Sequence, residues 1–158
     1  MNNERIETTI LTNLFYNEDF TRKTLPFLKP LYFNKRDERI LFEEVEKFVL
    51  KYKNVPTKEA IAIELNSRKD VNEEEFKNVR TLIDSLIHEE TDLQWLLDTT
   101  EKFCKDRAVH NAVLDGIKIL DGKDNKKTPE AIPSILADAL AVSFDNHVGH
   151  DYLQDYLE

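Results

Sequence analysis

Residues 92–121 read DLQWLLDTTEKFCKDRAVHNAVLDGIKILD, a stretch of sequence without proline. Its apolar side chains recur at steps of three and four residues, which is the period of an α-helix. The predicted helix has about twice the average length of a helix in a globular protein. Thr91 is expected to cap its first turn, and Gly122 is expected to end it.

The second half of this helix carries two apolar stripes. Because successive residues are about 100° apart, the stripes lie well apart around the helix, and this half needs two packing surfaces. One stripe consists of Val109, Val113 and Leu120, and the other of Phe103, Leu114 and Ile117.

Small residues also recur every four positions along the helix, at Ala108, Ala112 and Gly116. Such a row would let a second helix approach closely. The alternative is that Gly116 is only a tolerated defect, which costs about 1 kcal/mol relative to alanine.

A polar turn at residues 123–129 separates this helix from a second apolar period. That period consists of Ile132, Ile135, Leu136, Ala139, Leu140 and Phe144. Pro133 suits the first turn of the returning helix. A long helix, a short loop and a returning helix form an αα-hairpin, whose outward face is the expected docking surface.

The first 90 residues contain further helical patterns, around residues 6–15, 20–28, 37–52, 57–65 and 72–87. Thr57 is an expected N-cap, and Asn72 with Glu75 matches a capping box. The charged residues of the third pattern are expected on its solvent side; they are Glu43, Glu44, Glu46 and Lys47. We therefore predict an all-α fold with a helical head at 1–90, a long αα-hairpin at 91–144 and the start of a linker helix within 145–158.

The composition limits the classes of function. The chain has 158 residues, 41% of them hydrophobic, with only three glycines and five prolines, which favours one helical core over a β-sandwich. A net charge of −9 disfavours strong direct DNA binding. The single Cys104 excludes an internal disulfide, and no apolar run of about 18 residues suggests membrane insertion. A cytoplasmic protein is predicted.

No set of residues predicts catalysis, a cofactor or a metal site. A phosphate-binding loop of the form GxxxxGKS or GxxxxGKT does not occur. Cys104 and His110 lie six residues apart, so they point in different directions on a helix. His147, His150 and Asp151 lack diagnostic metal-ligand spacing, and a solvated linker is the preferred interpretation.

Several segments nevertheless resemble one family. Residues 131–140, Ser143-Phe144-Asp145 and Val148-Gly149-His150-Asp151 resemble the end of the N-terminal domain of the DnaB-like replicative DNA helicases of tailed phages. Gln94-Trp95-Leu96 and Asp106-Arg107-Ala108 resemble the long helix of that domain.

The resemblance implies a hexameric ring that unwinds duplex DNA in the cytoplasm of an infected bacterial cell, with ATP and Mg²⁺ used by a RecA-like motor domain. The motor would follow residue 158, so this chain itself is expected to hold no cofactor. The implied role of the N-terminal domain is a collar, which self-associates as a dimer, trimer of dimers or hexamer through its hairpins. The collar also contacts primase and, as a further implied partner, a helicase loader.

By position, the implied hairpin and subunit interface consists of Phe103, Val109, Val113, Ile117, Ile135, Leu136 and Leu140. Each could instead belong to the core of its own chain, because a hairpin must also hold itself together. The implied linker residues are Gly149, Asp151, Tyr152, Leu153 and Tyr156. The alternative function is a stand-alone helical adaptor or inhibitor, which a reading frame continuing into a phosphate-binding loop would exclude.

Overall fold

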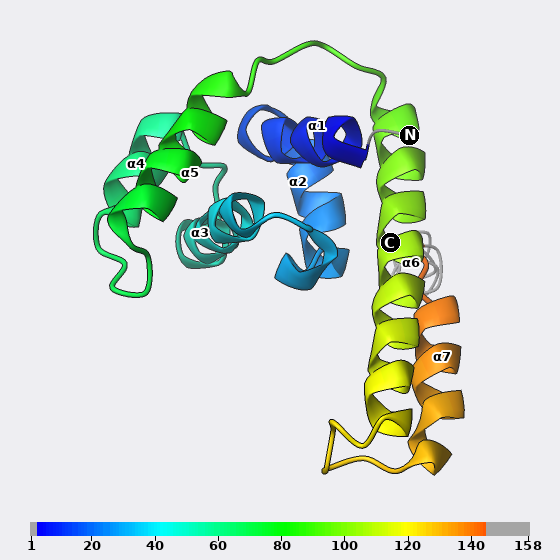
Figure 1. Ribbon diagram of the computed structural model, residues 1–158. Helices are drawn as coiled ribbons and strands as arrows, with labels where there is room; N and C mark the ends of the chain where they lie inside the picture. Colours follow the sequence, from blue (N-terminus) through cyan, green and yellow to red (C-terminus); the bar gives the residue numbers. More distant parts are fainter. Residues whose placement is uncertain (1–2, 145–158) are drawn as a thin grey trace. The chain divides into compact units, whose positions relative to one another are not determined.

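The computed structural model describes residues 3–144, which are helical with short connections and contain no strand (Figure 1). The predicted all-α class is confirmed, while the predicted start of a linker helix lies outside the described residues. The elements are α1 (Asn3–Tyr16), α2 (Glu18–Thr24), η1 (Leu25–Phe27), η2 (Pro30–Tyr32), α3 (Arg36–Tyr52), α4 (Lys58–Leu65), α5 (Glu73–Ser85), α6 (Leu93–Leu120), η3 (Pro129–Ala131) and α7 (Ile132–Leu140).

The chain divides into two compact units, Met1–Thr100 and Glu101–Glu158, of which 3–100 and 101–144 are described. The division falls inside α6, further along the chain than the predicted boundary at residue 90. The first turns of α6 belong to the first unit, where Leu96 and Thr100 are buried. We call the first unit the head and the second the hairpin.

The head is built around α3, which packs against α1, α4 and α5. The apolar positions of α1 and α3 recur at helical spacing, so each helix buries one face. The rings of Phe33 and Phe42 stack with centroids 5.3 Å apart. The fully buried residues of this core include Ile10, Leu11, Leu14, Phe20, Ile40 and Leu41.

Side-chain caps begin several helices of the head. Thr57 Oγ1 accepts a hydrogen bond from Ala60 N, and Asn72 and Glu75 form the reciprocal pair of a capping box, as predicted. The predicted cap at Thr91 is wrong. Asp92 Oδ2 accepts the hydrogen bond from Trp95 N at 2.9 Å, whereas the Thr91 hydroxyl donates to the carbonyl oxygen of Glu89.

The helix predicted to reach residue 87 ends earlier, at Ser85. Leu86 has an extended backbone with φ −77° and ψ 113°, yet its side chain is buried. The apolar period therefore identified a buried residue correctly and the secondary structure at that residue incorrectly. Ile87, the last member of the pattern, is 77% exposed.

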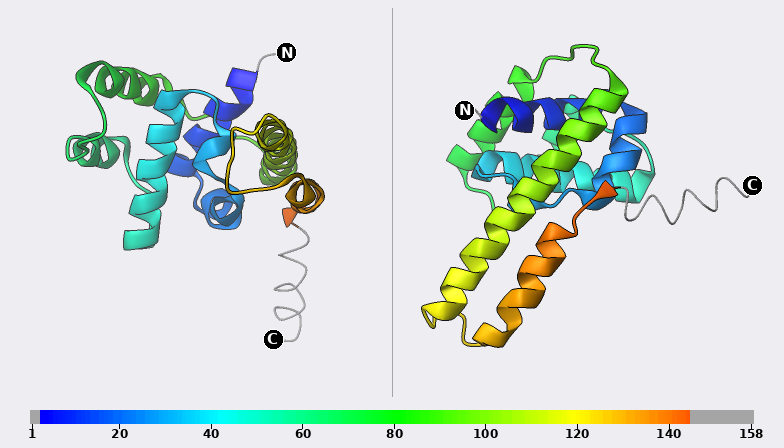
Figure 2. Two further views of the ribbon diagram at one scale, coloured as in Figure 1. Left: turned by 60° about the horizontal axis from the view of Figure 1, so that its bottom comes forward. Right: turned by 90° about the vertical axis from the view of Figure 1, so that its right-hand side faces the viewer.

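The hairpin consists of α6 from Glu101 onward and of α7, which runs back beside it (Figure 2). Gly122 ends α6 with φ +73°, and Lys123 N donates to the carbonyl oxygen of Lys118, as in a Schellman motif. Pro133 lies in the first turn of α7, as predicted, but α7 ends at Leu140, before Phe144. Gly116 faces the side chain of Ile132, and an added Cβ would make an ordinary van der Waals contact with it, so the packing of α7 on α6 does not require a glycine here.

Substituting the two hairpin glycines by alanine should have opposite effects on stability. A Cβ at Gly116 would meet Ile132 at 3.7 Å, an ordinary contact, so Gly116→Ala should raise the free energy of unfolding by about 0.5–1 kcal/mol through helix propensity. Gly122→Ala should lower it by about 1–2 kcal/mol, because the residue has a left-handed conformation. Urea unfolding followed by circular dichroism measures both changes. If the two substitutions changed the free energy of unfolding in the same direction, the different roles given to the two glycines would be contradicted.

A pair of carboxyl groups is buried in the head. Glu7 of α1 is 1% exposed and Glu38 of α3 is 2% exposed. Burial, and then the hydrogen bond and charge of Glu7, raise the pKa of Glu38 to about 8. The folded head therefore keeps a proton on Glu38 that the unfolded chain releases near pH 4.5.

The stability contributed by protonated Glu38 should be fully present below about pH 4.5 and lost as the pH rises through about 8. Burial also raises the pKa of Glu46, so the stability contributed by this residue likewise falls as the pH rises. Glu38→Gln should flatten the fall in melting temperature over this range, while the exposed Glu73→Gln should leave it unchanged. Equal slopes for the wild type and Glu38→Gln would contradict the buried proton.

Candidate functional site: the apolar side of the hairpin

One face of α6 within the hairpin is directed at α7. Ala112 is 4% and Ile119 is 5% exposed, and they share this face with Gly116, which contacts Ile132. At about 100° per residue, a second apolar row lies about a quarter turn further around α6. This row consists of Val113, Ile117 and Leu120, which are 46%, 48% and 68% exposed.

The returning helix has a matching arrangement. Ala139 is 7% exposed and shares a face with Ile132. Relative to Ile132, Leu136 lies about 40° and Leu140 about 80° further around α7. Gly116 is level with Ile132, and Glu101 is level with Ser143, so the two helices are antiparallel. When two antiparallel helices face each other, residues that lie a given angle beyond the contacting face, counted along each chain, are on the same side of the pair.

Four exposed apolar residues therefore lie on one side of the hairpin: Val113, Ile117, Leu120 and Leu140. Leu114, 44% exposed, lies further around α6 and is not part of this side. Leu140 is 61% exposed and Leu136 is half-buried, so this surface extends across both helices. We call it the apolar side, and it consists of Val113, Ile117, Leu120, Leu136 and Leu140.

At the end of the hairpin opposite the loop, a carboxylate links the returning segment to α6. Glu101 Oε2 accepts a hydrogen bond from Ser143 Oγ at 3.0 Å and from Phe144 N at 2.7 Å. Both ends of α7 are thus fastened to α6, by the loop and by Glu101. This role of Glu101 was not predicted, since no helical period relates it to Ser143.

The predicted interface residues fall into three groups. Phe103 is 6% exposed and its ring lies 5.5 Å from the Arg107 guanidinium carbon. Val109, Ile135 and Leu136 are half-buried, and Val113, Ile117 and Leu140 are exposed. Their role between subunits stays a prediction. Leu120 is exposed beside Ile117. It was not among the predicted interface residues, although the sequence had already placed it on an apolar stripe of the helix.

The predicted linker residues Gly149, Asp151, Tyr152, Leu153 and Tyr156 lie outside the described residues. So do the histidines considered as metal ligands. Among residues 3–144, no group of three or more histidine, cysteine, aspartate or glutamate side chains is arranged to hold a metal ion. Within residues 3–144, none of the helices combines the length and the hydropathy of a transmembrane span.

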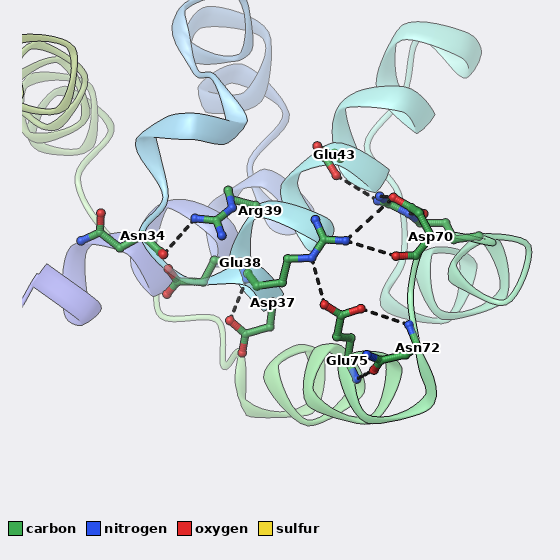
Figure 3. A network of polar contacts seen from close by, with 10 residues as sticks. Asn34, Asp37, Glu38, Arg39, Glu43, Asp70, Asn72 and Glu75 are labelled. Carbon is green, nitrogen blue, oxygen red and sulfur yellow. Dashed lines mark hydrogen bonds and ion pairs between the residues drawn. The ribbon is translucent and has the colours of Figure 1, made fainter. Parts of the chain in front are cut away.

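A cluster of charged side chains joins three segments of the head (Figure 3). Arg68, between α4 and α5, pairs with Asp70 at 2.6 Å and with Glu43 of α3 at 3.0 Å. Arg36 of α3 pairs with Glu75 of α5 at 3.1 Å. The Arg68 guanidinium lowers the pKa of Asp70 to about 2. Because these carboxylates are paired with guanidinium groups, the cluster is structural and not a candidate acid or base.

Glu44 corrects the predicted solvent side of α3. Its side chain is only 4% exposed, and Glu44 Oε2 lies 3.3 Å from Arg68 Nη1. Glu44 Oε1 lies 3.5 Å from Lys47 Nζ and accepts no hydrogen bond among the described residues. A charged residue is buried here because its partner comes from a segment distant in the sequence.

Cys104 cannot serve as a nucleophile at neutral pH. The residue is fully buried, and burial raises the pKa of its thiol to about 12. A thiol that keeps its proton is a poor nucleophile and a poor metal ligand.

Comparison with known proteins bears on the family. No family model matches the chain. The chain is 34% identical over 155 residues to the DnaB-like replicative helicase of Enterobacteria phage T4, a match that covers 93% of this chain. The chain is a homologue of part of a DnaB-like replicative helicase. It spans about a third (32%) of the length of that relative. The DnaB-like resemblance predicted from the sequence is confirmed.

Removing the central cation of the charged cluster should destabilise this DnaB-like head. Arg68→Ala would leave the buried Glu44 without its guanidinium partner, and we expect it to lower the free energy of unfolding by about 3 kcal/mol. Arg80→Ala, at an exposed position of α5, is the matched control and should change it by less than about 0.5 kcal/mol. Chemical denaturation measures both, and equal effects would show that the cluster has no structural role.

Proposed function

We propose that the chain is the N-terminal collar domain of a phage replicative DNA helicase. In this role it associates with further copies through the hairpin and contacts primase during DNA replication. The ATP-dependent unwinding of DNA belongs to the longer protein, whose motor would lie in the part of the relative that this chain does not match. The homology over 93% of the chain supports the placement in such a helicase.

The observation that carries the proposed self-association is the apolar side of the hairpin. Single exposed apolar residues are common on protein surfaces and need no explanation. Here Val113, Ile117, Leu120 and Leu140 are all 46% exposed or more, and they lie on one side of two adjacent helices. A contiguous apolar surface of this kind is typical of a protein interface. Two copies related by a two-fold axis could bury it against each other.

The charge of the chain supports protein partners over nucleic acid. With 31 acidic and 22 basic residues, the domain would be repelled by a phosphate backbone. Primase is the partner that the family resemblance implies, and a helicase loader is a further one. ATP and Mg²⁺ would be bound by the motor and not by this domain.

Solution mass tests the proposed association. We expect the light-scattering mass of the wild type to rise above that of one chain as concentration increases. Val113→Asp would place a charge in the apolar side and should raise the dissociation constant by about a hundredfold or more. Circular dichroism should show unchanged helicity, because Val113 is 46% exposed within the chain.

Ile63→Asp is the matched control, since Ile63 lies on α4 of the head and is 56% exposed. It should leave the association unchanged. A strictly monomeric wild type, or equal dissociation by the two substitutions, would overturn the proposed role of the hairpin.

A further inference from the structure

A polar pocket of about 420 Å³ lies in the head. It is formed by one side of α1 and by the segment that follows α5, which pass close to each other (Figure 1). Its lining is rich in hydroxyl groups, contributed by Thr8, Thr9, Thr12, Ser85 and Thr91. None of the residues that line it is basic.

The hydroxyl protons in this pocket are already engaged. Thr9 donates to the carbonyl oxygen of Arg5 at 2.6 Å, and Thr12 donates to that of Thr8 at 2.7 Å. A carbonyl oxygen can only accept, so each hydroxyl must be the donor. The same holds for Ser85 and Thr91, which donate to the carbonyl oxygens of Leu82 and Glu89. What these side chains can still offer a ligand is the lone pairs of their oxygens.

Asn13 adds a further acceptor to the pocket lining. The residue is 3% exposed and lines the pocket, and its Nδ2 donates to the carbonyl oxygen of Thr9 at 2.9 Å. Its Oδ1 accepts no hydrogen bond from the described residues. The side chain lines the pocket, so this oxygen is an acceptor that a ligand supplying N–H groups can use.

Glu89 makes the pocket attractive to a cation. It is the one charged residue among those that line the pocket, and it is exposed at the edge. One carboxylate beside neutral hydroxyls is a poor site for a divalent metal ion, which prefers several charged oxygen ligands. An organic cation with many N–H groups fits these acceptors better.

We propose that this pocket binds an arginine side chain presented by a partner protein. A guanidinium group carries five N–H donors in one plane, whereas a lysine ammonium carries three and is more strongly hydrated. Glu89 would pair with the charge, and the hydroxyl oxygens and Asn13 Oδ1 would accept the remaining N–H groups. Ile87, 77% exposed and also part of the lining, would cover the methylene groups of the arginine. The proposal is independent of the collar role, because it uses only residues of the head.

Titration followed by amide NMR tests the pocket with three blocked amino acids. The probes are the Nα-acetyl amides of arginine, lysine and citrulline, the last being an uncharged analogue of arginine with the same shape. We expect arginine to shift the signals of Thr9, Thr12, Thr91 and the Asn13 side-chain amide. Citrulline should bind at least about tenfold more weakly, because the charge-assisted hydrogen bonds are lost. Lysine should bind more weakly than arginine.

Matched substitutions locate the site. Glu89→Gln should weaken arginine binding about tenfold, while Glu90→Gln, next to it and outside the pocket lining, should have little effect. Thr9→Val should weaken binding, while Thr81→Val, on an exposed position of α5, should not. Unchanged circular dichroism would establish that each variant is folded.

Several outcomes would overturn the proposal. They are equal binding of arginine and citrulline, tighter binding of lysine than arginine, shifts that lie outside the pocket, or no shift at the highest soluble concentration. Equal weakening by Glu89→Gln and Glu90→Gln would show a diffuse charge effect in place of a site.

Discussion

The contact between Gly116 of α6 and Ile132 of α7 determines what the rest of the hairpin presents. Because α6 meets α7 through Ala112, Gly116 and Ile119, its larger residues at Val113, Ile117 and Leu120 are left to one side. Leucine or phenylalanine at the three contacting positions would change the distance and the angle between α6 and α7. A different set of side chains would then be buried between the two helices. The apolar side is therefore exposed because α6 uses a different face to pack against α7.

The head depends on a different balance of forces. Its core is apolar and lies around α3, but charged residues are buried at its edges, where Glu7, Glu38 and Glu44 are each 3% exposed or less. Glu44 is compensated by Arg68, while Glu38 remains protonated near neutral pH. Two solutions to the cost of burying a carboxylate therefore occur on the same helix.

Most of the helices could be predicted from the sequence, because helical periodicity reports which residues are buried. This explains why α3, α5 and α6 were located well, and why α5 was extended too far, since Leu86 is buried without being helical. The solvent exposure assigned to Glu44 failed because its partner, Arg68, is distant in the sequence. The choice between Thr91 and Asp92 as a cap could not be made from residue type, since both are good caps. Within the candidate site, the stripes contained the exposed apolar residues of α6, but they separated Ile117 from Val113 and Leu120, which form one row in the structure. The side that this row shares with α7 required the antiparallel pairing of the two helices.

The burial of Cys104 has a consequence for any assembly of this chain. Cys104 is buried and its thiol keeps its proton, so this residue offers no route to a disulfide between copies. Contacts between copies through the apolar side are non-covalent and obey mass action. An assembly held together by the proposed contacts of the apolar side is therefore one that dilution can take apart and that local accumulation can rebuild.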